Sequence, residues 1–148
     1  MAGFRFPLEK VLGWRRTELE IAEAGFKREA AALQEIDRQM AECEAAGIRA
    51  ELQVRGWDSV TGGDLEALGS FRLYVKAAQA EMARKRAEQA RKLKAREALM
   101  MEARRRYRLL EKLKERRREE WTAEENRAVE AAASESYLAK WIREGDGR

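Results

Sequence analysis

The chain of 148 residues has no histidine, one cysteine and one proline. Without histidine it lacks the commonest general base and the commonest metal ligand of proteins. The single cysteine, Cys43, cannot form an internal disulfide, and we interpret it as a small apolar side chain in a reducing compartment. Because proline is the strongest helix breaker, a single one leaves room for very long helices.

Long apolar runs are missing too. No stretch approaches the ~20 apolar residues that a membrane-spanning helix needs, and residues 1–7 lack an apolar run of signal-peptide length. The sequence also has no P-loop, no GxGxxG, no CxxC and no nucleophile elbow. We therefore expect a cytoplasmic protein that is not an enzyme and has no catalytic residue, no cofactor, no metal site and no small-molecule substrate.

Charged residues are abundant, at 39% of the chain, and together with many alanines they are typical of a long helix or coiled coil. From Leu8 to Cys43 an apolar stripe advances in steps of three and four, which is the coiled-coil period. A stripe this narrow must be buried against another helix, and the obvious partner lies in the same chain. The predicted coiled-coil seam consists of Leu8, Leu12, Leu19, Phe26, Leu33, Ile36 and Met40.

A glycine-rich segment divides the chain into two helical stretches. We predict helix one over about 5–54, a turn over about 55–63 and helix two over about 64–144, with Asp64 as the N-cap. At 1.5 Å per residue helix two is much the longer, so part of its surface should have no intramolecular partner. The predicted fold is all-α: one domain over residues 1–148 that forms an antiparallel two-helix coiled coil, a long helical hairpin.

The positive charge is concentrated in helix two. Residues 84–118 carry 16 basic and 5 acidic side chains, so +11, whereas residues 119–148 carry 4 and 8, so −4. Consecutive arginines spread around a helix and do not form one face that reads DNA bases. Three interpretations stay open: a solvated helix surface, an acidic protein partner, and a nucleic acid or membrane surface.

Three segments have a familiar order and spacing. They are the opening run 4–12 followed by 14–16, the aromatic entry to helix two at 71–75, and the closing pattern Glu124, Arg127, Glu130 and Glu135 after the basic stretch 109–118. Together these segments resemble the FliJ family, the soluble stalk proteins of the bacterial flagellar type III export apparatus. The resemblance covers nearly the whole chain.

The resemblance implies an antiparallel coiled coil similar to the gamma stalk of rotary ATP synthases. It implies a non-catalytic protein that binds the hexameric flagellar export ATPase, promotes its assembly and activity, couples it to the membrane-bound export gate, and takes part in handling export chaperones at the cytoplasmic face of the inner membrane. The candidates for ATPase binding are Arg104, Arg105, Arg106, Arg116, Arg117, Arg118, Glu124 and Arg127. The candidates for export-gate binding are Phe71, Tyr74, Val75, Ala78 and Met82.

Alternatives accompany these expectations. The gate candidates fit plain packing against helix one equally well, because the same side chains suit both roles. A basic helical hairpin that binds nucleic acid through phosphate contacts is the alternative function from another class. A structural adaptor of a related type III secretion system and a homodimerising coiled coil are the others.

Overall fold

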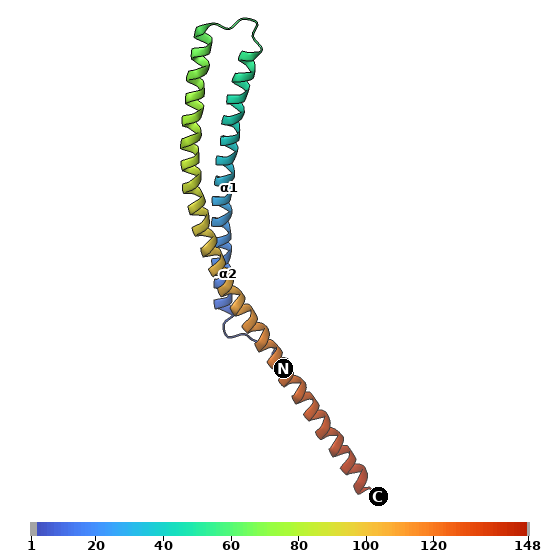
Figure 1. The fold of residues 1–148 in the computed structure, drawn as a ribbon. Helices are drawn as coiled ribbons and strands as arrows, with labels where there is room; N and C mark the ends of the chain where they lie inside the picture. Colours follow the sequence, from blue (N-terminus) through green and yellow to red (C-terminus); the bar gives the residue numbers. More distant parts are fainter. Residues whose placement is uncertain (1–2, 148) are drawn as a thin grey trace. The chain divides into compact units, whose positions relative to one another are not determined.

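The computed structural model describes residues 3–147, and it contains two helices, α1 (Glu9–Arg55) and α2 (Gly62–Asp146) (Figure 1). Among the described residues there is no strand. The two long helices pack against each other, which confirms the predicted all-α helical hairpin.

Helix α1 begins later than the predicted residue 5. Pro7 and Leu8 form a turn, and the first helical residue is Glu9, whose backbone N–H donates to the Phe6 carbonyl at 3.1 Å. The physical reason is Pro7, because a proline disfavours helical backbone angles in the residue before it. Residues 3–8, called the strap below, therefore precede α1 as a non-helical segment.

Helix α2 begins two residues before Asp64, so the predicted N-cap was wrong. The N-cap is Thr61: its hydroxyl accepts the Asp64 N–H at 3.1 Å, and the Asp64 carboxylate accepts the Thr61 N–H at 2.9 Å. This reciprocal arrangement is a capping box, in which each side chain satisfies a backbone donor of the other residue. The connection between the helices is therefore only residues 56–61.

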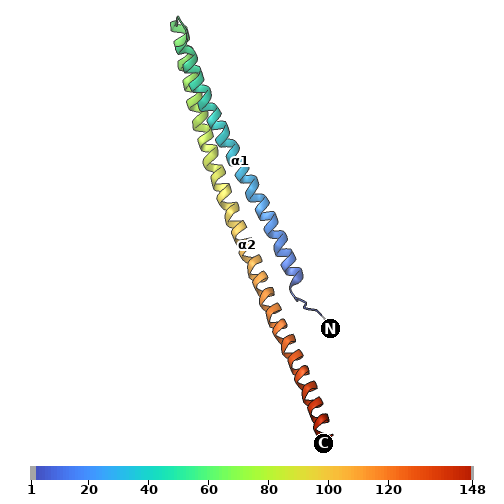
Figure 2. The same cartoon turned by 90° about the vertical axis from the view of Figure 1, so that its right-hand side faces the viewer.

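The chain forms two compact units. The loop unit comprises residues 19–102. Within it α1 and α2 lie side by side and run antiparallel, and the loop at residues 56–61 joins them (Figures 1 and 2). The predicted seam residues of α1 in this unit are half-buried, as is Cys43. They lie opposite a matching half-buried stripe on α2, formed by Leu68, Phe71, Val75, Ala78, Met82 and Leu93.

The middle of the loop-unit seam is polar. Of the four alanines in this stretch of α2, Ala80, Ala83 and Ala87 are exposed and only Ala90 is half-buried. The half-buried Gln89 side chain crosses to α1 instead, where its Nε2 donates to the Glu29 carbonyl at 3.1 Å and also to the Glu29 carboxylate. Because an alanine side chain buries little area, polar contacts determine here which residues of α1 and α2 face each other. Ion pairs Arg86–Asp37 and Arg72–Glu51 add to them.

The terminal unit comprises residues 3–18 and 103–147. Its most enclosed side chains are Leu12 and Phe6, at 3% and 8% exposure. Leu8, which the stripe assigned to the seam, is 39% exposed, because it precedes the first turn of α1 and its direction is not set by the helical period. From residue 126 to residue 147 every side chain is exposed.

Candidate functional site

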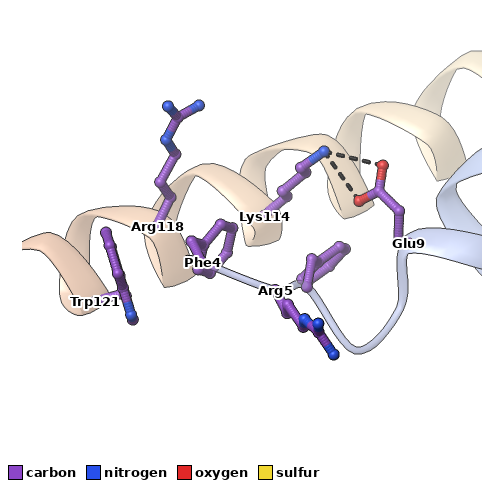
Figure 3. Close-up of a pocket in the computed structure, with 7 residues that line it drawn as sticks. Phe4, Arg5, Glu9, Lys114, Arg118 and Trp121 are labelled. Carbon is purple, nitrogen blue, oxygen red and sulfur yellow. Dashed lines mark hydrogen bonds and ion pairs between the residues drawn. The ribbon is translucent and has the colours of Figure 1, made fainter. Parts of the chain in front are cut away.

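The strap lies against the turns of α2 around residues 114–121, within the terminal unit (Figure 3). The Phe4 and Trp121 rings are 6.1 Å apart between centroids and tilted by 50°, a geometry that aromatic pairs favour. Phe6 is buried, and Glu9 forms an ion pair with Lys114 at 2.9 Å. The strap is therefore held by aromatic packing at one end and by an ion pair at the other.

Two clefts flank the strap. Their shared walls are Phe4, Arg5, Phe6 and Trp121. The first cleft has a volume of about 750 Å³ and is completed by Glu9, Lys114 and Arg118. The second has a volume of about 490 Å³ and is completed by Pro7, Leu8, Leu113, Arg117, Glu120 and Glu124.

The two clefts differ in charge. In the second cleft Arg117 pairs with Glu120 at 3.6 Å, and the further carboxylate of Glu124 balances the charge of Arg5, which lines both clefts. In the first cleft three cations face one carboxylate, and that carboxylate already pairs with Lys114. Neither Arg5 nor Arg118 forms an ion pair with any described residue. Figure 3 shows both guanidinium groups pointing away from the Glu9–Lys114 pair.

The excess positive charge extends beyond the cleft, over the part of the terminal unit formed by residues 3–18 and 103–118. Residues 3–18 and 103–118 together carry 13 basic and 4 acidic side chains, a net charge of +9. Some of these cations are engaged within the unit: the Arg16 Nη2 donates to the Tyr107 hydroxyl at 3.2 Å, and its guanidinium lies 5.7 Å from the centre of that ring. The remaining excess makes this surface suited to anionic partners.

The structure places all the predicted ATPase-binding residues on α2 within the terminal unit. Arg118 lines the first cleft, and Arg117 and Glu124 line the second. Arg104 is half-buried, while the others are exposed. The residues that line neither cleft are Arg104, Arg105, Arg106, Arg116 and Arg127.

The predicted gate-binding residues lie in the loop unit and separate into two groups. Phe71, Val75, Ala78 and Met82 are half-buried on the seam-facing stripe. Val75 comes so close to Gly47 that its Cγ1 would lie 3.4 Å from a Cβ added there. Tyr74 instead is 69% exposed. Packing against α1 thus accounts for the first four residues but not for Tyr74.

Sequence reasoning missed the strap as part of a site. Phe4 and Phe6 entered only as part of the opening run 4–12, and Trp121 was not assigned to any site. A possible signal was the cluster of two aromatic residues and an arginine before the only proline. That signal does not identify which part of α2 the strap contacts. Leu73, 71% exposed beside Tyr74, was likewise not singled out as exposed.

The described residues contain neither a metal-binding cluster nor a helix that could span a membrane. Within residues 3–147 no group of three or more His, Cys, Asp or Glu side chains is placed to hold a metal ion. None of the helices, as far as they are described, is long and apolar enough to span a membrane.

Comparison with known proteins gives no match to any family model, any curated protein or any solved structure.

Proposed function

We propose that this protein is a non-catalytic stalk of the flagellar protein export apparatus that binds the hexameric export ATPase. The observation that carries the proposal is the net charge of +9 on residues 3–18 and 103–118, which includes Arg5 and Arg118, two arginines that form no ion pair with a described residue. A surface of this kind attracts acidic protein segments and speeds their association. The resemblance of three sequence segments to FliJ stalks identifies which acidic partner to test.

In this proposal the catalytic residues belong to the ATPase. The stalk contributes a helical surface that contacts more than one subunit, which favours ring assembly because anything that binds the assembled state stabilises it. The loop unit then contacts the cytoplasmic part of the export gate, and export chaperones are further partners. The protein would therefore sit at the cytoplasmic face of the inner membrane through protein contacts.

The test of ATPase binding compares two triple charge reversals. Arg116, Arg117 and Arg118 changed to Glu should weaken binding of the purified ATPase by about tenfold or more, and should also reduce its salt dependence. The matched control reverses Lys85, Arg91 and Lys92, three exposed cations of the loop unit, and changes the net charge equally. Circular dichroism verifies that both variants stay helical. Unchanged binding of the first variant, or equal weakening of both, would contradict the proposed contact.

The gate contact is tested with residues of different burial. Tyr74→Ala removes an exposed ring, so it should weaken binding to the purified cytoplasmic part of the gate and leave the melting temperature nearly unchanged. Val75→Ala, in the seam, should lower the melting temperature instead. If Tyr74→Ala leaves gate binding intact, Tyr74 has no role in this contact.

The nucleic-acid alternative draws on the same excess charge. It predicts affinity for duplex DNA that falls steeply with salt concentration, together with no affinity for the ATPase. A titration of the purified chain with both ligands at two salt concentrations separates the two functions.

A further inference from the structure

The first cleft combines cationic side chains with aromatic walls. Arg118 and Arg5 have no ion pair with a described residue, so their N–H donors are available to an incoming carboxylate. A guanidinium binds a carboxylate through two parallel hydrogen bonds, which gives direction as well as attraction. Exposed charge alone would favour any anion, so the other walls of the cleft decide what kind of anion fits.

Those walls are aromatic. Phe4 and Trp121 are both only half-buried, and they border the cleft beside the free arginines. Half-exposed rings gain free energy when an apolar side chain covers them. A small inorganic anion would leave these rings uncovered. A peptide that carries a carboxylate next to an apolar side chain satisfies the arginines and the rings together.

We propose that the first cleft binds an acidic segment of the partner protein, with a carboxylate on Arg118 and an adjacent apolar side chain against Phe4 and Trp121. The inference rests on the proposed function, which supplies the partner, namely the export ATPase. It goes further because it assigns one cleft and the chemistry of the segment that enters it. The second cleft is excluded because Glu120 and Glu124 already balance its cations and would repel an acidic peptide.

Adjacent arginines provide a matched pair of variants. Arg118→Glu reverses a charge in the first cleft, and Arg117→Glu reverses a charge one residue away in the second. Both variants have the same net charge and nearly the same long-range field. Isothermal titration calorimetry with the purified ATPase should therefore show about tenfold weaker binding for Arg118→Glu and no more than about threefold for Arg117→Glu. Melting temperatures of both variants, followed by circular dichroism, check that the terminal unit stays folded.

A second measurement identifies the occupant. Phe4 is replaced by p-benzoylphenylalanine, a photoreactive and bulkier derivative of phenylalanine, and the complex with the ATPase is irradiated and digested. Mass spectrometry should then find the crosslink on an ATPase peptide with at least two acidic residues beside an apolar one. A crosslink to a basic or neutral peptide would overturn the proposal, as would equal weakening by the two charge reversals. If the unmodified chain fails to bind the ATPase at all, the proposed function is wrong, and so is this occupant.

Discussion

The loop unit and the terminal unit contain stretches of the same two helices, but different contacts hold them. In the loop unit a half-buried apolar seam runs along both helices and is crossed by Gln89 and by ion pairs. In the terminal unit contact is concentrated on a few side chains, above all Leu12 and Phe6. A long, repetitive interface tolerates the loss of one member, whereas a short one with few enclosed side chains depends on each. The loop unit thus depends on a regular pairing of the two helices, and the terminal unit on a few enclosed side chains.

The strongest test of this difference is truncation of the most buried side chain in each unit. Leu12→Ala should destabilise by about 2–3 kcal/mol through lost burial and the cavity left behind. Met100→Ala, at 9% exposure in the loop unit, should cost less, because methionine is flexible and the neighbouring seam is long. Chemical denaturation of both variants gives the free energies of unfolding. A larger loss for Met100→Ala would reverse the comparison.

The polar crossing of the loop unit is tested at Gln89. Gln89→Ala removes the hydrogen bonds to Glu29 and should lower the free energy of unfolding by about 1 kcal/mol. Gln79→Ala is the control, because that glutamine is also half-buried on α2 and has no hydrogen bond to a described residue. Equal effects of the two substitutions would mean that the crossing contributes packing but no specific hydrogen bonding.

A substitution at Gly25, a glycine of the seam, is expected to raise the stability of the protein, whereas the substitutions above lower it. The three atoms nearest to a Cβ added at Gly25 all belong to the Arg96 side chain, at 3.5 Å or more, which is ordinary contact. Gly25→Ala should therefore stabilise α1 by roughly 0.5–1 kcal/mol through better helix propensity. Gly13→Ala, in the terminal unit with nothing near, is the reference for propensity alone. Thermal melts of both variants show whether the Arg96 side chain accommodates the added methyl group without loss of stability. A smaller gain in melting temperature for Gly25→Ala than for Gly13→Ala would show that it does not.

The smallest expected effect is the pH response of the capping box. Hydrogen bonds from the Thr61 backbone N–H and hydroxyl hold the pKa of Asp64 below its ordinary value. The carboxylate therefore stabilises the start of α2 above the pKa of an unfolded aspartate, ~4, and this stabilisation is lost as pH falls through the lowered pKa. Amide hydrogen exchange at Thr61 and Asp64, whose N–H groups are hydrogen-bonded in the capping box, measures it between pH 2 and 5. Asp64→Asn should flatten this pH dependence, and an unchanged profile would show that Asp64 does not cause it.

Most of the fold could be predicted from the helical period of the apolar residues. Steps of three and four correctly placed Leu19, Phe26, Leu33, Ile36 and Met40 among half-buried positions, because one face of a helix repeats with that spacing. The period also passes through Glu29, a polar residue that Gln89 of α2 contacts across the seam. Which residue of α2 faces which residue of α1 depends on where the loop closes, and the Thr61 cap was not recognised.

The strap could not be predicted in the same way. Phe4 and Trp121 are separated by more than a hundred residues, and the strap has no helical period that would give it a direction. Leu8 shows the same limit, since the stripe was extended past Pro7 to a residue that is not helical. Charge counting located the basic segment of helix two. It did not distinguish Arg117 from Arg118, because that distinction depends on the acidic residues and on the strap that surround each one.

The final turns of α2 have a thermodynamic consequence of their own. From residue 126 to residue 147 no side chain is covered, so these turns depend on local backbone hydrogen bonds and on the helix–coil equilibrium. Their helicity should fall towards Asp146 and respond to temperature more gradually than the cooperative units do. A protein that covers Tyr137 and Trp141, which are 69% and 65% exposed, would therefore gain contact area and order the helix in one step. The measured enthalpy of its binding would include the heat of forming those last turns.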